Sequence, residues 1–145
     1  MKARARILLG AVYLVAILTS ATTALAADPP VVVGEVGTRV IGDHADLPKE
    51  LRRALEREIA SLVLRQVPRA KRFVLSASVV KLERQEDPRA VSCTVSVVLR
   101  EKKSGAIRAI LEGRARATIE GSEGESAALE AAARASIASL PEALR

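Results

Sequence analysis

The chain of 145 residues has almost no aromatic side chains: one Tyr, one Phe and no Trp. Proteins that bind RNA or single-stranded DNA stack bases on aromatic rings, so this shortage argues against nucleic-acid binding. The chain also has one Cys and one His. A single thiol cannot form an internal disulfide, and a single imidazole is a poor basis for a metal site.

The first 26 residues have the three parts of a cleavable secretory signal peptide. Three basic residues come first, followed by an uncharged apolar run over 7–18 and by small residues before the expected cleavage between Ala26 and Ala27. An uncleaved anchor is the alternative, but a spanning helix needs about 20 apolar residues and this run has 12. We therefore expect an exported protein, periplasmic or extracellular, without a stable membrane anchor.

Loss of this segment changes the charge of what remains. The whole chain has 23 Lys+Arg against 17 Asp+Glu, a net charge of +6, and three of the basic residues lie in the first six positions. The mature chain therefore has 20 basic residues against 17 acidic ones, or +3. Such a small charge on a mixed surface gives little attraction for nucleic acid.

The residues after the signal begin with a short extended lead at 27–30. Residues 31–41 are rich in β-branched side chains but contain two glycines, a pattern typical of an edge strand. From 46 to 66 the apolar side chains recur at helical spacing. Asp46 is expected to cap this helix, and Pro68 is expected to end it.

The second half of the chain predicts three strands and a helix. Residues 73–80, 91–100 and 107–119 alternate between apolar and polar side chains. A turn-prone stretch at 85–89 and a Lys-Lys-Ser-Gly sequence at 102–105 connect them. A last helix starting at Ser122 or Ser126 is expected to stop at Pro141.

Together these elements predict a single small α+β domain over 31–145, with the order β-α-β-β-β-α. We expect an antiparallel three-stranded meander plus an edge strand, with two helices packed on one face.

The run RFVLSASVVKLE at 72–83, preceded by an amphipathic helix, resembles a strand of a bacterial envelope group. That group contains the curli-secretion channel protein, the lipoprotein activators of penicillin-binding proteins and the TolB N-terminal domain. A valine-rich strand, a tight hairpin and an alanine-rich terminal helix follow in the same order. Many members are lipoproteins anchored through an N-terminal cysteine, where this chain has Ala27. The resemblance implies a non-catalytic scaffold or activator.

One face of the predicted sheet is expected to be free of helices and to present basic side chains. Arginines alternate along the last strand, and further basic residues, Arg100 and Lys81, are expected on neighbouring strands. The candidate partner-binding face is therefore Arg100, Arg108, Ile110, Arg114 and Arg116. The alternative is a solvated polar face in which Glu112 and Glu120 neutralise the arginines.

No catalytic, metal or cofactor site is predicted. His44 lies between two aspartates, but a solvated loop explains it better than a site. The serines and threonine at 76, 78, 92, 94 and 96 alternate with apolar residues and lack a nucleophile elbow. Cys93 is in phase with apolar neighbours and is expected to be buried, with an intermolecular disulfide or a reactive thiol as the alternative.

Three functions remain open after these observations. The first, which we prefer, is a non-catalytic accessory or scaffold that binds an envelope protein. The second is a homo-oligomeric structural unit of the envelope. The third is a small hydrolase that uses His44 or a serine.

Overall fold

The computed structural model describes residues 28–62, 64, 67, 70–86, 89–118 and 122–145. The expected signal peptide and its cleavage site at Ala26 and Ala27 lie outside these residues. The elements are, in chain order, β1 (Val31–Thr38), α1 (Leu47–Ser61), β2 (Phe73–Glu86), β3 (Arg89–Glu101), β4 (Ile107–Ala117), α2 (Ser122–Ile137) and α3 (Leu140–Ala143).

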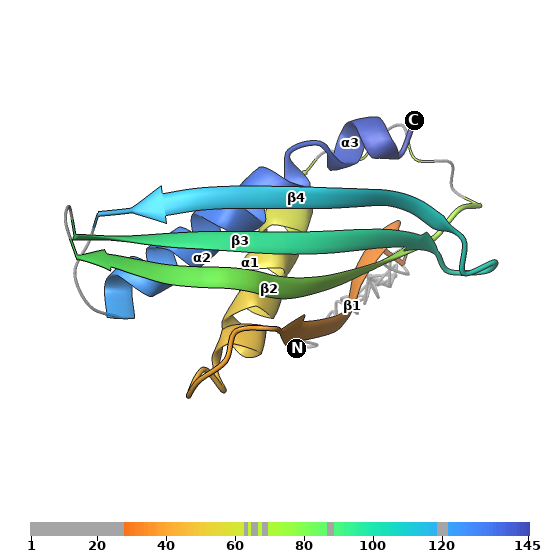
Figure 1. The fold of residues 1–145 in the computed structure, drawn as a ribbon. Coiled ribbons are helices and arrows are strands. Elements are labelled where there is room, and N and C mark those ends of the chain that lie inside the picture. The colour runs from red at the N-terminus through yellow and green to blue at the C-terminus, as the bar shows by residue number, and fades with distance from the viewer. Residues whose placement is uncertain (1–27, 63, 65–66, 68–69, 87–88, 119–121) are drawn as a thin grey trace, which may run out of the picture.

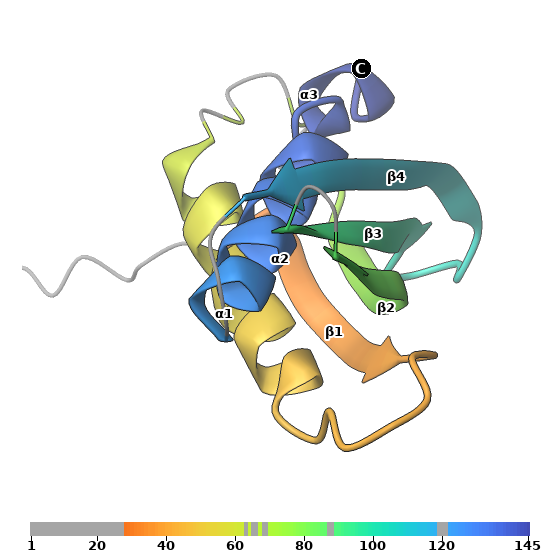
Figure 2. The ribbon, with the colours of Figure 1, turned by 60° about the vertical axis from the view of Figure 1, so that its left-hand side comes forward.

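The four strands form one sheet in the order β1-β2-β3-β4 (Figure 1). β2, β3 and β4 pair antiparallel, whereas β1 pairs parallel to β2. A parallel pair needs a crossover connection, and α1 lies within it. Figure 2 shows α1 and α2 side by side on one face of the sheet, which confirms the predicted α+β fold.

The long helix differs from its prediction at both ends. Asp46 has a helical backbone (φ −84°, ψ −17°) and its side chain makes no capping hydrogen bond, because a capping residue needs an extended backbone. The helix ends at Ser61, since Leu62 is extended (ψ 135°). Leu62 and Leu64 then pack against the core. Pro68, the expected terminator, lies outside the described residues.

β2 and β3 are longer than the alternation predicted. Gln85 pairs with Ala90 and Glu86 pairs with Arg89, so the expected turn at 85–89 is mostly strand. The antiparallel register shifts between Val79 and Lys81. This bulge moves the next residues onto the opposite face, which is why the alternation ends at residue 80 although the strand continues.

The β3–β4 turn has the predicted hairpin chemistry. Gly105 adopts φ +72°, a conformation that glycine takes without a steric penalty. Its N–H donates to the Glu101 carbonyl at 2.8 Å, and the Glu101 N–H donates to Ala106 at 2.9 Å. The Ser104 hydroxyl also donates to the Glu101 carboxylate at 2.9 Å.

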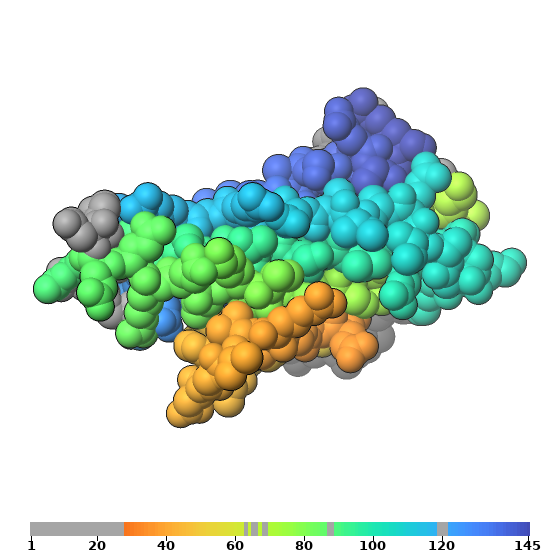
Figure 3. Space-filling model, in the orientation of Figure 1, coloured from red at the N-terminus to blue at the C-terminus, as the bar shows by residue number. Residues whose placement is uncertain are grey.

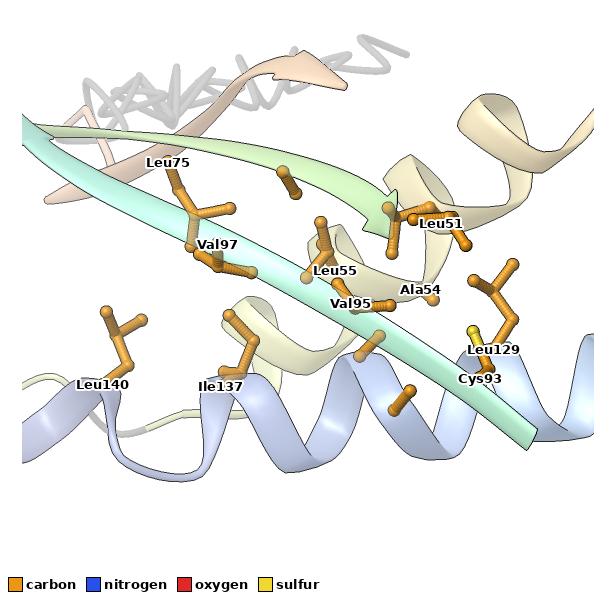
Figure 4. Packing of buried hydrophobic residues seen from close by; sticks show 14 of the residues in the cluster. Leu51, Ala54, Leu55, Leu75, Cys93, Val95, Val97, Leu129, Ile137 and Leu140 are labelled. Atoms are coloured by element: carbon orange, nitrogen blue, oxygen red, sulfur yellow. The ribbon is translucent and has the colours of Figure 1, made fainter. Parts of the chain in front are cut away.

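The core lies between the sheet and the two helices (Figure 4). It is built almost entirely from aliphatic side chains, and Phe73 is the only buried aromatic among the described residues. Its fully buried members include Leu51, Leu55, Leu75, Val79, Val95, Val97, Leu99, Leu129, Ile137 and Leu140. Alternate residues of β2 and β3 supply the sheet side of this core, as their period-2 patterns predicted.

α2 packs close to the sheet because the side chains at their contact are small. Gly113 of β4 is buried, and a β-carbon there would lie 1.9 Å from the Ala132 carbonyl oxygen. Ser136, also buried, directs its hydroxyl back to Ala133 O at 2.7 Å. α2 ends at Ile137, and Pro141 lies in the first turn of the short helix α3 instead of ending α2, because proline is well suited to a first helical turn.

Candidate functional site

Within the described chain, no helix covers the sheet face opposite α1 and α2 (Figure 1), and Figure 3 shows β2, β3 and β4 at the surface on this side. Strand register divides this open face into three zones. The apolar end is formed by Val74, Val98, Ile107 and Ile110. The hydroxyl floor is formed by Ser76, Ser78, Ser92, Thr94 and Ser96. The basic end is formed by Lys81, Arg114 and Arg116.

At the apolar end, Val98 lies opposite Ile110, and Arg100 lies between Val74 and Ile107. Ile107 and Ile110 are 58 % and 67 % exposed. Simple alternation along the last strand predicts Ile107 on the core side of the sheet, together with Ala109 and Leu111, and for Ile107 this prediction was wrong. The register shift between Leu99 and Arg100 leaves one extra residue in β4, and this bulge moves Ile107 onto the open face.

The hydroxyl floor follows the middle of β2 and β3. Ser78 lies opposite Ser96, and all five hydroxyl-bearing side chains are partly buried. Their outward direction agrees with the alternation in the sequence. Two shallow depressions adjoin between Ser96 and Thr94: one of about 350 Å³ towards β1 and one of about 630 Å³ towards β4.

At the basic end, Thr94 lies between Lys81 and Arg114, and Ser92 lies opposite Arg116. Arg114 Nε is 2.6 Å from the Glu112 carboxylate, and Lys81 Nζ is 2.9 Å from that of Glu83. Both pairs are exposed, so solvent screens them and they contribute little stability. The acidic residues therefore lower the positive charge of this end without removing it.

The structure brings together Arg100, Ile110, Arg114 and Arg116 on the open face but separates Arg108 from them. Arg108 is the unpaired residue of the β4 bulge. Its guanidinium donates to Ala143 O at 3.2 Å and to Arg145 O at 3.4 Å. Arg108 therefore holds the C-terminal segment against β4, and we assign it no part of the open face.

Sequence reasoning missed the residues that β1 and the position directly after it add to this site. Glu35 and Arg39, together with Thr38, line the smaller depression. Their position depends on the parallel pairing of β1 with β2, which the chain order alone does not specify. The glycine-interrupted β-branched run was the only available signal, and it indicated an edge strand without its direction.

Both edges of the sheet are modified in ways that hinder addition of another strand. In β1 the register shifts between Val33 and Val36. Arg52 of α1 donates to Val33 O at 3.3 Å and to Gly34 O at 2.5 Å, so these carbonyls already have a donor. At β4, α2 lies directly against Gly113. The broad open face is therefore the more accessible docking surface.

The single histidine lies in the loop before α1, and the single cysteine lies in the core. Among the described residues, no group of three or more His, Cys, Asp or Glu could hold a metal ion. The backbone N–H of His44 donates to the Gly42 carbonyl oxygen at 3.0 Å. Cys93 is 1 % exposed, and burial raises the pKa of its thiol to about 11. The prediction that Cys93 is buried is confirmed.

No helix in the described part of the chain is long and apolar enough to cross a membrane.

Comparison with known proteins places this chain by its fold. No protein-family model matches it, and no curated protein matches it. A hypothetical protein of Chlamydia trachomatis aligns with a TM-score of 0.54 at 13 % identity, covering 79 % of this chain and 96 % of that one. PelC of Paraburkholderia phytofirmans, solved as a dodecamer, aligns with a TM-score of 0.54 at 18 % identity, covering 81 % and 92 %. At such low identity the likeness establishes a shared fold across most of the domain.

Proposed function

We propose that this chain is an exported, non-catalytic accessory protein of the bacterial cell envelope, which binds another envelope protein through the open face of its sheet. The observation that carries the proposal is the pair of exposed isoleucines, Ile107 and Ile110, beside arginines on a face without helices. Apolar groups surrounded by charged and polar ones are typical of protein interfaces. The N-terminal signal sequence supports export, and the resemblance to envelope scaffolds supports the location.

A non-catalytic role fits the chemistry of the described residues. Cys93 is buried and its raised pKa keeps the thiol protonated, so it is a poor nucleophile. The only histidine of the chain, His44, lies in the loop before α1, whereas the outward serines lie on β2 and β3. A serine nucleophile needs an adjacent base. His44→Ala should therefore leave the protein's function in cells unchanged, which a deletion-complementation assay measures.

Self-association is the second candidate, supported by the dodecameric assembly of PelC. An antiparallel pairing of two β4 strands would bring the two copies of α2 towards one another beneath the joined edge, because α2 lies against Gly113 of β4. Two packed helices need about 8–10 Å between their axes, so the helices would limit this pairing. If the protein self-associates, we therefore expect the open face to form the contact.

The test is affinity capture of the mature protein from the periplasm, comparing the wild type with Arg114→Glu/Arg116→Glu. We expect the double variant to capture at least tenfold less of the envelope partner than the wild type does. The matched control is Lys49→Glu/Arg53→Glu, which makes the same charge change at exposed positions of α1. Equal capture by all three proteins would contradict the role of the basic end.

Sedimentation velocity separates the two candidates. A wild type that is monomeric at high concentration while still capturing a partner supports the accessory role. A defined oligomer that dissociates in Ile110→Asp, without any captured partner, would support self-association instead.

A further inference from the structure

We propose that the hydroxyl floor receives a single amphipathic α-helix of the envelope partner, oriented with apolar side chains over the apolar end and acidic side chains over the basic end. This inference rests on the proposed function and names the kind of segment that the open face recognises.

The width of the floor suits a helix. β2 and β3 carry small hydroxyl-bearing side chains, whereas longer ones stand at the flanks: Glu35 and Arg39 from the β1 side, Glu112 and Arg114 from β4. Adjacent strands lie about 4.8 Å apart, so the three spacings from β1 to β4 total about 14 Å. A helix with its side chains is about 10–12 Å across, and the two adjoining depressions mark where it would sit.

The pairing of the central strands favours a helix over an extended segment. β2 is paired with β1 and β3, and β3 is paired with β2 and β4. The backbone groups of the floor are thus used within the sheet. An extended ligand on this face would have no strand edge with which its backbone could form hydrogen bonds. Its N–H and C=O groups would then be buried without partners, which is costly. An α-helix satisfies these groups internally.

The distribution of charge on the open face sets the orientation of the partner helix. Lys81, Arg114 and Arg116 gather at one end, whereas at the other end Ile107 and Ile110 are exposed and Arg100 lies beside Ile107. Acidic residues complement the first end, and leucine-like residues complement the second. A partner helix should therefore change from apolar to acidic along the face that contacts the floor.

The distance between two positions on β3 can distinguish a helical partner from an extended one. Ser92 and Val98 point to the same face six residues apart, which is about 20 Å along a strand. A helix covers 20 Å in about 13 residues, whereas an extended segment covers it in about six.

The experiment places a benzophenone-bearing residue at Ser92 or, separately, at Val98 of the full chain in its own host. The cross-linked residues of the captured protein are then identified by mass spectrometry. We expect both probes to mark one segment, at positions about 13 residues apart, with Asp or Glu within one turn of the residue linked to position 92. A probe at Arg53 on the helical side is the matched control and should not mark this segment.

The remaining outcomes are distinguishable. Marks about six residues apart in a partner would overturn the helix and leave the proposed function in place. Cross-links only to a second copy of this chain would overturn the helix in favour of self-association. If neither probe on the open face gives a product that the Arg53 probe lacks, both the helix and the proposed function are overturned.

Discussion

Gly113 of β4 and Ala132 of α2 approach so closely that a β-carbon on Gly113 would lie 1.9 Å from the Ala132 carbonyl oxygen. That carbonyl is part of the helix backbone, so it cannot move away as the end of a flexible side chain would. The closeness lets α2 cover β4, and it also places a helix beneath the outer edge of the sheet. One glycine therefore controls both the packing of the core and the accessibility of the β4 edge.

Replacing Gly113 with alanine should force α2 away from the sheet. We expect Gly113→Ala to lower the free energy of unfolding by about 3 kcal/mol, the upper part of the usual range for overpacking. Urea unfolding followed by circular dichroism measures this. Gly37→Ala is the control, because a β-carbon there meets nothing within 4 Å. Equal effects of the two substitutions would contradict the close approach.

The buried thiol of Cys93 should make stability depend on alkaline pH. Burial raises the thiol pKa from 9.0 to about 11, so the folded state retains the proton to higher pH than the unfolded state does. The stabilising contribution is complete below pH 9 and is lost as the pH rises from 9 to about 11. Between these values the wild type should lose roughly 2–3 kcal/mol more than Cys93→Ala. If the denaturant midpoints of the wild type and Cys93→Ala fall by the same amount as the pH rises, this prediction is contradicted.

The Arg52 guanidinium connects α1 to the bulged edge of β1 through Val33 O and Gly34 O. We expect Arg52→Ala to lower the free energy of unfolding by about 1 kcal/mol and to speed amide hydrogen exchange in β1. Arg52→Lys should recover little, because an ammonium lacks the two-pronged geometry of the guanidinium. Arg53→Ala, at the exposed neighbouring position, should leave exchange in β1 unchanged.

The positive φ of Gly105 should make the β3–β4 hairpin sensitive to any side chain there. A β-carbon at this position has open space around it, so the cost of Gly105→Ala is purely conformational. We expect a loss of about 1 kcal/mol. Gly105→Asn should be milder, because asparagine tolerates the left-handed conformation. Thermal unfolding that ranks asparagine below alanine would contradict this explanation.

The sequence predicted the elements whose patterns are local. Leu75, Val95 and Val97 follow the period of a half-buried strand, and the structure buries all three completely. Leu51 and Leu55 follow helical spacing and are also fully buried. The hairpin at Gly105 was equally predictable, because a tight turn needs a residue that accepts positive φ. In each case one segment carries its own signal.

The errors occurred where a single residue shifts the pattern. The β4 bulge moved Ile107 to the open face and turned Arg108 towards the C-terminal carbonyls. The β2 bulge interrupts the regular alternation, so the sequence pattern did not predict the second half of that strand. Bulges depend on how two strands fit together, so neither strand contains the information alone.

The sequence by itself determined the fold class, the order of the elements and an outward row of hydroxyls, because side-chain alternation and helical spacing are properties of one segment. Only the tertiary structure decided which residues share the open face. It did so through the parallel pairing of β1, the two bulges and the close contact between Gly113 and α2. These features arise from contacts between segments far apart in the chain, where the pairing of backbones and the fit of side chains decide the register.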